Sequence, residues 1–300
     1  MRILVTGSNG LLGQKLIALL QNDPGVYPIA TARGESATKL ARAAFRSMDV
    51  TNHEQVLNVV KEEKPEVIIH TAAMTQVDDC ETQRDQCWNA NVNAVQYLAE
   101  ACALNNTHLV HVSTDFIFDG TEGPLDETAT PAPVNYYGES KLAAEQLIMK
   151  QNIKWAILRT VLVYGITNDM SRSNIVLWVK NSLQAGKPIK VVNDQWRTPT
   201  LAEDLAMGCY LAAIKKATGV YHISGKDFLS PYDIAIATAE YFKLDKSLIS
   251  ATDSNTFKQP ARRPLKTGFI IDKAKRDLGY APLSFKEGLS VIDRQLRLAR

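Results

Sequence analysis

The sequence predicts an α/β fold, a doubly wound parallel sheet followed by a smaller C-terminal α/β region. Three observations lead to this prediction. Short apolar runs rich in β-branched residues alternate with longer amphipathic stretches through roughly the first 160 residues, as in βαβ units. A glycine-rich turn directly follows the first apolar run. Beyond about residue 166 the alternation loosens into pieces punctuated by proline and glycine, which indicates a second, less regular region.

The elements of the first region follow from these patterns in chain order. The expected strands are Arg2–Thr6, Tyr27–Ala32, Phe45–Met48, Val67–Thr71, His108–Ser113 and Trp155–Arg159. The expected helices are Leu11–Gln21, Asn52–Glu63, Gln86–Asn105 and Tyr137–Asn152. Their apolar residues recur at spacings of three and four, and Thr51 and Asn52 are candidate caps of the second helix. We expect residues 1–165 to form the sheet domain.

The second region is expected at residues 166–300. The expected helices are Asn174–Gln184, Ala202–Lys215, Pro231–Phe242, Asp272–Leu278 and Phe285–Leu298, and the strands are Ile189–Val192 and Val220–Ile223. The sequence contains no internal repeat or flexible linker at which the chain divides. We therefore expect this region to pack directly on the first and to form one wall of a cleft, with the chain able to cross between the two.

Composition excludes several classes of partner. Lys and Arg number 34 against 32 Asp and Glu, a net charge of +2, so no global field attracts nucleic acid or an anionic membrane. No stretch approaches the roughly 18 apolar residues of a membrane span. Because an apolar strand follows Met1 almost at once, we expect no signal peptide. The four cysteines have no metal-ligand spacing. We expect a cytoplasmic protein without a metal, for which a homo-oligomer stays open.

The turn after the first strand has the spacing G-x-x-G-x-x-G. It consists of Gly7, Ser8, Asn9, Gly10, Leu11, Leu12 and Gly13. Glycines permit a tight turn and a close approach of backbone to a pyrophosphate, and the helix that follows presents unpaired N–H groups to the anion. A glycine-rich turn without a ligand is the alternative, but the strand before and the helix after favour a dinucleotide-binding domain of the Rossmann type.

Three further positions bear on the dinucleotide. The residue about 20 positions after the last glycine is acidic where NAD is bound, and here it is Arg33, which suits the 2′-phosphate of NADP. Glu35 lies close enough to keep NAD possible. Asp49 and Val50 follow the third strand, where Asp49 could bind the adenine amino group or simply begin the next helix. The small pair Ala72-Ala73 could let the cofactor pass over the fourth strand.

A candidate catalytic constellation lies further along the chain. Tyr137 and Lys141 stand four residues apart, hence on one face of a helix, and Thr114 lies at the end of the fifth strand. Ligands bind at the carboxyl ends of strands in such sheets. An adjacent ammonium lowers the pKa of a phenol, so Tyr137 could exchange a proton while hydride moves. Lys141 would also hold the nicotinamide ribose, and Thr114 would bind the substrate carbonyl.

These motifs, in this order and spacing, resemble the extended short-chain dehydrogenase/reductases across essentially the whole chain. Four segments are similar more specifically to the dTDP-4-dehydrorhamnose reductases: residues 71–78, residues 113–120, Asp194-Gln195 with Pro199-Thr200, and Arg263-Pro264. The resemblance implies an NADP-preferring reductase that delivers hydride to the 4-keto group of a nucleotide-linked deoxy sugar, in dTDP-rhamnose biosynthesis. It also implies that residues 166–300 bind the substrate.

The same resemblance assigns further residues. Asn91 would be the helix asparagine that supports the proton relay. Thr75, Val77, Asp78 and Asp115 would line the sugar pocket. The sequence departs from the family at Leu162, where the reductases commonly carry tryptophan, and this departure bears on the identity of the sugar.

Alternative functions stay open at this point. A dehydratase is disfavoured because Thr114-Asp115 is followed by Phe116 and not by an acid. Another sugar-nucleotide reductase, an epimerase, or a non-catalytic NADP-binding subunit similar to the regulatory subunit of methionine adenosyltransferase remains possible.

Several other residues have two interpretations. Arg262, Arg263 and Lys266, with Asp194, Gln195, Trp196 and Arg197, could bind a nucleotide diphosphate or form an ordinary charged loop. His70, His108 and His111 lie in strand patterns and are expected to be core histidines.

Overall fold

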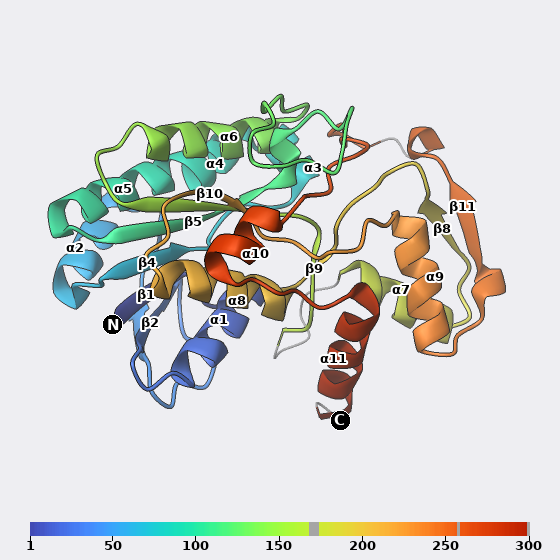
Figure 1. Cartoon of the computed structure of the whole chain (residues 1–300), viewed down its shortest axis with the longest axis horizontal. Helices are drawn as coiled ribbons and strands as arrows, with labels where there is room; N and C mark the ends of the chain where they lie inside the picture. The colour runs from blue at the N-terminus through green and yellow to red at the C-terminus, as the bar shows by residue number, and fades with distance from the viewer. Residues whose placement is uncertain (168–173, 257–258, 299–300) are drawn as a thin grey trace.

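A seven-stranded parallel sheet is the centre of the computed structural model, which describes residues 1–167, 174–256 and 259–298 (Figure 1). The strand order is β10-β6-β5-β4-β1-β2-β3. The strands are β1 (Arg2–Thr6), β2 (Tyr27–Ala32), β3 (Ala44–Ser47), β4 (Val67–His70), β5 (His108–Thr114), β6 (Trp155–Thr160) and β10 (Gly219–His222). Every neighbouring pair in this sheet runs parallel. The order reverses at β1, as a doubly wound sheet requires.

Helices cover both faces of the sheet, as the sequence predicts (Figure 1). The large helices of this part are α1 (Leu11–Gln21), α2 (His53–Glu63), α5 (Ala94–Asn105), α6 (Tyr136–Met149) and α8 (Ala202–Ile214). Alternate residues of the strands supply the two cores. In β1, Ile3 and Val5 pack with α1 and α8, whereas Leu4 packs with α2, α5 and α6. This period of two is what a strand buried on both faces produces.

The predicted helix Gln86–Asn105 is wrong as one continuous element. The segment forms α4 (Arg84–Trp88), a π-helical turn η1 (Asn89–Asn93) and α5, and α3 (Val77–Thr82), which the sequence did not predict, precedes them. The interruption coincides with Asn91, whose amide group binds both backbone polar groups of Met74. π-turns within helices frequently accompany functional sites.

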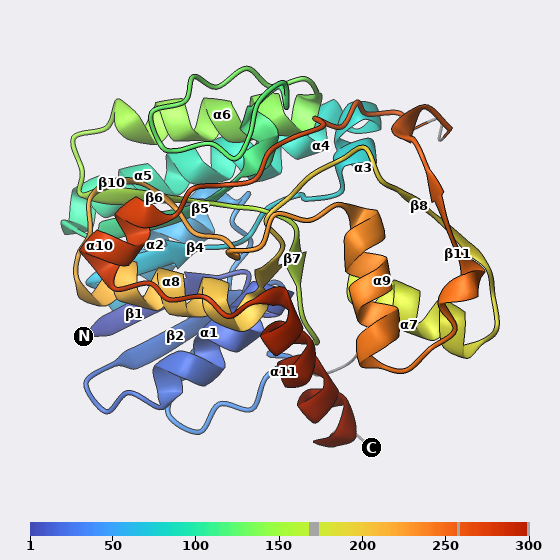
Figure 2. The same cartoon turned by 45° about the vertical axis from the view of Figure 1, so that its right-hand side comes forward.

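A smaller group of elements stands beyond the carboxyl edge of the large sheet (Figure 2). It contains α7 (Ile175–Gln184), β8 (Ile189–Val192), α9 (Pro231–Tyr241) and β11 (Ile249–Thr252), where β8 pairs with β11 in parallel. The short strands β7 (Val163–Tyr164) and β9 (Thr200–Leu201) pair at the junction, and α11 (Phe285–Leu298) packs near α9. Short 3-10 turns complete the fold at η2 (Asp115–Ile117), η3 (Lys246–Leu248) and η4 (Ser254–Thr256).

The chain crosses between the two groups of elements. After β9 it returns to the large sheet through α8 and β10, and later through α10 (Asp272–Leu278), which packs against α8 and β10. The division at residue 165 into a dinucleotide-binding domain and a substrate-binding region therefore stays a prediction about function. No helix in the described ranges is long and apolar enough to cross a membrane.

Candidate active site and cofactor site

The glycine-rich turn brings the start of α1 against β1. Gly7 has φ +68°, and a Cβ atom there would lie 2.9 Å from the amide nitrogen of Ala72. A Cβ atom at Gly13 would lie 2.2 Å from the carbonyl oxygen of Gly7. The α1 helix begins after Gly10, where no side chain caps it. The first N–H groups of α1 are therefore available to an anion.

Ser8 and Asn9 complete the turn. The Ser8 hydroxyl is buried and has no hydrogen-bond partner within the described part of the chain. The Asn9 side chain donates to the carbonyl of Glu35 at 2.8 Å and accepts from the N–H of Ala37 at 2.9 Å. These bonds hold the loop after β2 beside the turn. Arg33 lies exposed at the start of that loop, and the structure gives its guanidinium no partner among the residues it describes.

The other predicted cofactor positions surround this turn. Asp49 Oδ1 accepts from both the backbone N–H and the hydroxyl of Thr51, at 2.9 and 2.8 Å, while Asn52 caps α2. Val50 packs against the core beneath α2. Ala72, together with Thr71, donates its N–H to Thr6 Oγ1, and Ala73 is half-buried beside it. Leu11 and Leu12 open α1. All of these residues stay predictions as ligand contacts.

Thr114 and Tyr137 meet at the carboxyl end of β5. Both side chains are buried, and a side-chain hydrogen bond with Thr114 acts on the phenol. Gly138 permits this approach, since a Cβ atom there would lie 2.1 Å from the carbonyl oxygen of Phe116. Asn135 caps α6 by accepting the N–H of Gly138 at 2.8 Å.

Burial raises the pKa of Tyr137, and the Thr114 hydrogen bond opposes the rise. The expectation that the pKa of Tyr137 lies below its ordinary value is therefore wrong for this structure. Lys141 directs Nζ to the carbonyl of Val112 at 2.8 Å and to His111 Nε2 at 3.2 Å. Desolvation of the phenolate outweighs other effects, so Tyr137 is a neutral phenol at ordinary pH.

Lys141 is buried on the same face of α6 as Tyr137. Burial lowers its pKa to about 8, and the charge of Glu145 opposes the decrease. The residue is therefore mainly an ammonium at pH 7. A cation and a neutral phenol thus lie one helical turn apart beside the end of β5.

Asp115 follows Thr114 and is held by groups from distant parts of the chain. Its Oδ2 accepts the hydroxyl of Thr267 and lies 3.5 Å from Arg197 Nε. Burial raises the pKa of Asp115, with the Arg197 charge opposing. The carboxylate therefore joins β5 to the second region, and its predicted contact with the sugar stays a prediction.

Asn91 connects the π-turn to the catalytic helix. Besides its two bonds to Met74, its amide donates to Ser140 Oγ at 3.0 Å, and Ser140 lies between Tyr137 and Lys141 on α6. Asn91 is 1% exposed. The residue therefore fixes the position of α6 relative to the loop after β4, and its proton-relay role stays a prediction.

The predicted sugar-pocket residues Thr75, Val77 and Asp78 lie on the loop after β4 and on α3. Thr75 is exposed, and Val77 packs beside Cys80 and Tyr137. Asp78 binds Arg263 through two hydrogen bonds, of 2.6 and 2.8 Å. The Arg263 guanidinium lowers the pKa of that carboxyl. The pair therefore ties α3 to the segment that follows residue 259.

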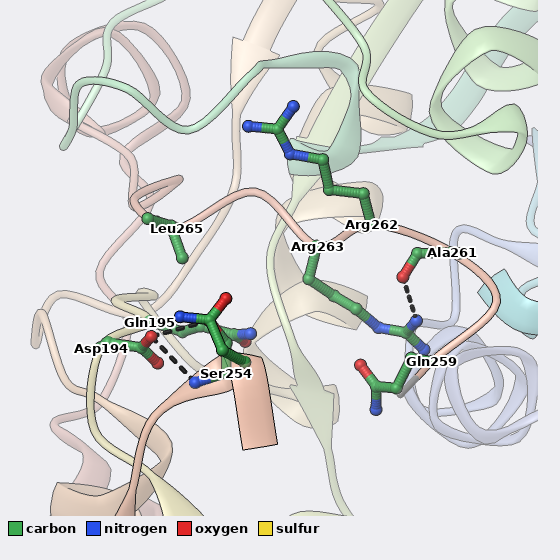
Figure 3. Close-up of a pocket in the computed structure, with 9 residues that line it drawn as sticks. Asp194, Gln195, Ser254, Gln259, Ala261, Arg262, Arg263 and Leu265 are labelled. Carbon is green, nitrogen blue, oxygen red and sulfur yellow. Dashed lines mark hydrogen bonds between the residues drawn. The ribbon is translucent and has the colours of Figure 1, made fainter. Parts of the chain in front are cut away.

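A pocket of about 310 Å³ adjoins this segment (Figure 3). Its lining residues are Asp194, Gln195, Ser254, Asn255, Gln259, Ala261, Arg262, Arg263 and Leu265. Asp194 Oδ2 accepts both the N–H and the hydroxyl of Ser254. In Figure 3, Arg262 and Arg263 leave the segment in opposite directions. The structure thus brings Asp194 and Gln195 to the same pocket as Arg262 and Arg263, and their binding of a nucleotide stays a prediction. Trp196 and Lys266 form a β-bridge and line a second pocket with Phe228.

Sequence reasoning missed the contacts of the buried histidines. His70 and His111 are core residues as expected, and they stack with ring centroids 5.3 Å apart. His111 also contacts Lys141, which periodicity alone could not show. The parallel register that places His70 opposite His111 is the structural signal. His108 is buried further back on β5. The described residues contain no cluster that could hold a metal ion.

Comparison with known proteins identifies the family. The chain is 32% identical to dTDP-4-dehydrorhamnose reductase of Aggregatibacter actinomycetemcomitans, over 97% of this chain and 98% of the relative. It is also 32% identical to methionine adenosyltransferase 2 subunit beta of Pongo abelii, over 84% of this chain and 76% of that relative.

A solved structure agrees with this similarity. The crystal structure of dTDP-4-dehydrorhamnose reductase from Bacillus anthracis in complex with NADP has a TM-score of 0.84 and 29% identity, over 98% of this chain and 99% of that one. The RmlD substrate binding domain family matches residues 1–297. The resemblance predicted from the motifs is therefore confirmed, and the chain belongs to the RmlD substrate binding domain family, with the fold of the extended short-chain dehydrogenase/reductases.

Proposed function

We propose that the chain is an NADP-preferring reductase that transfers hydride to the 4-keto group of a nucleotide-linked deoxy sugar. The finer proposal is dTDP-4-dehydrorhamnose reductase in dTDP-rhamnose biosynthesis. The convergence of Thr114, Tyr137 and Lys141 at the carboxyl end of β5, on the same edge of the sheet as the open start of α1, carries this proposal. The similarity to reductases of that name supports it.

The chain's residues fit a dinucleotide. The α1 helix lacks a side-chain cap, and the Ser8 hydroxyl has no partner in the described ranges. A Cβ atom at Gly7 or Gly13 would clash with the backbone of Ala72 or of Gly7, so glycine is needed for the turn to keep this shape. The amides of the turn would hold the pyrophosphate, and Arg33 would bind the 2′-phosphate. NADPH supplies the hydride when it is bound.

Tyr137 gives the proton in the proposed reduction. Its raised pKa keeps the phenol neutral and competent as an acid. Thr114 donates a hydrogen bond to the substrate oxygen as negative charge develops there. The Lys141 ammonium, one helical turn away, would attract the phenolate left behind, an effect smaller than the burial that raises the pKa of Tyr137. Each of the three side chains therefore has a separate task.

The pocket near Arg262 would hold the nucleotide end of the substrate. Arg263 already shares its charge with Asp78, so Arg262 is the better candidate for a diphosphate. Its backbone carbonyl accepts the Asn135 side chain at 2.8 Å, so this segment is attached to the start of α6. Nucleotide and reacting carbon would thereby be positioned by one connected set of bonds.

A substrate screen tests this function. NADPH oxidation is followed with a panel of 4-keto sugars linked to different nucleotides, and each product is identified. We expect oxidation with one 4-keto deoxy sugar linked to a nucleotide and a product reduced at carbon 4. A sugar converted without net NADPH oxidation would identify an epimerase, and the reductase proposal would be wrong.

A non-catalytic NADP-binding subunit is the second candidate, because of the similarity to methionine adenosyltransferase 2 subunit beta. The same screen separates the two. Tight NADPH binding without oxidation by any 4-keto sugar of the panel would favour the subunit. The presence of all three predicted catalytic side chains favours the enzyme.

A further inference from the structure

The buried ammonium of Lys141 has two acceptors in the structure. They are the carbonyl oxygen of Val112 at 2.8 Å and Nε2 of His111 at 3.2 Å. An ammonium has three N–H donors and no acceptor, so the histidine nitrogen must accept. This assignment places the ring proton of a neutral His111 on Nδ1. One N–H of Lys141 is then left for a ligand or for the phenol.

The neutral state of His111 follows from its surroundings. Burial lowers the pKa of His111 well below its ordinary value, and the charge of Lys141 lowers it further. The ring therefore stays an acceptor over the whole range in which the enzyme works. A protonated histidine here would repel the ammonium, whereas a neutral one holds it.

His70 and Thr6, on the strands next to the glycine-rich turn, fix the position of the His111 ring. His70 stacks on His111, with planes 28° apart, and its Nδ1 lies 2.7 Å from Thr6 Oγ1. Thr6 Oγ1 accepts the backbone N–H groups of Thr71 and Ala72, so its own proton goes to His70. Thr6 ends β1 directly before the glycine-rich turn. A continuous set of contacts therefore joins that turn to Lys141.

We propose that His111 is a positioning residue that orients the Lys141 ammonium, so that its third N–H remains available to the cofactor. This inference rests on the proposed function of Lys141. It assigns to His111 a part in the reaction that neither the motif nor periodicity reveals. A lysine on a four-carbon stem has many rotamers, and two fixed acceptors select one orientation.

The other groups that face Lys141 define the expected change in its titration. Glu145 on the same helix and Cys87 on α4 raise the pKa of Lys141, and burial lowers it. His111 and His70 on the neighbouring strands are neutral, and Tyr137 on α6 is a neutral phenol. Removing the acceptor His111 destabilises the ammonium and leaves the neutral amine unaffected. We therefore expect the pKa of Lys141 to fall.

Three variants test the inference. His111→Leu removes the acceptor, and His111→Gln restores an acceptor oxygen near the place of Nε2. His108→Leu is the matched control, because His108 is also buried on β5 and its ring nitrogens have no hydrogen-bond partner among the described residues. The measurements are kcat and KM against pH, NADPH affinity, and the titration of Lys141 Nζ by nitrogen NMR of labelled lysine.

We expect His111→Leu to lower kcat by about tenfold to a hundredfold, the usual effect of losing a hydrogen bond to a charged group. The alkaline limb of its pH profile moves by about one unit to lower pH, because the ammonium is the active form. NADPH affinity falls, His111→Gln recovers most of each loss, and His108→Leu leaves the pH profile in place.

The NMR titration separates this inference from the proposed function. A fall of the Lys141 pKa in His111→Leu, reversed in His111→Gln, supports the contact even if no substrate is found. An unchanged pKa, or equal losses in His111→Leu and His108→Leu, would overturn the positioning role.

Discussion

The cofactor turn and the catalytic end of β5 use different chemical groups of the chain. The turn uses backbone amides and the absence of side chains at Gly7 and Gly13. The catalytic end uses buried polar side chains, and burial shifts the pKa values of Tyr137 and Lys141 against their charged forms. Substitution should therefore act in opposite ways. Adding atoms damages the turn, whereas removing a buried charge at the catalytic end damages activity and relieves a cost to folding.

The loss of Lys141 is expected to have a large effect on both turnover and cofactor binding. Lys141→Met should lower turnover by a factor of at least about 10², within the usual contribution of a positioned acid-base group. NADPH affinity should also fall, because the same ammonium would serve the ribose and the phenol. Stopped-flow turnover and fluorescence titration measure both. Full retention of either quantity would limit Lys141 to the other task.

The same substitution should stabilise the fold near neutral pH. The pKa of Lys141 is lowered from 10.5 to about 8, so between these values the unfolded chain holds a proton that the folded protein has released. Stability therefore rises with pH across that window and is lost as pH falls through about 8. Between pH 7 and 9.5, the free energy of unfolding of the wild type should rise by about 2 kcal/mol relative to that of Lys141→Met, at 1.36 kcal/mol for each pH unit above about 8.

Urea unfolding of both proteins at several pH values measures this difference. Comparing the two proteins cancels the titration of other groups. If the free energies of unfolding of the two proteins differed by the same amount at every pH, burial would not disfavour the Lys141 ammonium. The contrast between the cofactor turn and the catalytic end of β5 would then lose its physical basis.

At the cofactor turn, Gly13→Ala should lower the affinity for NADPH by about a hundredfold. The new Cβ atom would lie 2.2 Å from the Gly7 carbonyl oxygen, so the turn must move. Gly25→Ala is the control, because its Cβ atom would meet only the Asp23 carboxylate at 3.3 Å. Fluorescence titration of each variant measures the affinity. Wild-type binding by Gly13→Ala would show that the pyrophosphate is held elsewhere.

The smallest expected effect is at Arg33, which is exposed beside the turn. Arg33→Ala should lower the affinity for NADPH by about tenfold and leave the affinity for NADH unchanged, because a charge-assisted contact to a phosphate contributes roughly 1.5–3 kcal/mol. Equal affinities of the wild type for NADPH and NADH, in the same titration, would remove the argument for NADP.

Sequence could predict what depends on local pattern. The bounds of β1, β2, α1 and α11 agree with the predicted ranges, because each is a strongly periodic run with clear ends. The strands β7 and β9 have two residues each, too few for a period to appear. The π-turn at Asn91 depends on a bond to Met74, seventeen residues away, which no local pattern carries.

The candidate site also has a part that local pattern predicts and a part that it does not. The glycines and the Tyr137–Lys141 spacing are local, so the sequence could identify them. The pairs Asp78–Arg263 and Asp115–Arg197 join residues 185 and 82 positions apart, the differences of their residue numbers. Such pairs exist only after the second region folds against the first. The pKa of Tyr137 also escaped prediction, because its burial depends on α3, α4 and α6 packing together.

The central claim is that Tyr137 donates the proton in an NADPH-dependent reduction, and Tyr137→Phe tests it most directly. The substitution removes one hydroxyl and keeps the ring that packs on Phe116. Turnover of a nucleotide-linked 4-keto sugar and NADPH affinity are measured on the same preparation. We expect turnover to fall by about 10²–10⁴ with NADPH affinity unchanged. Reduction of the sugar by Tyr137→Phe at near the wild-type rate would contradict the assignment of the acid and the mechanism built on it.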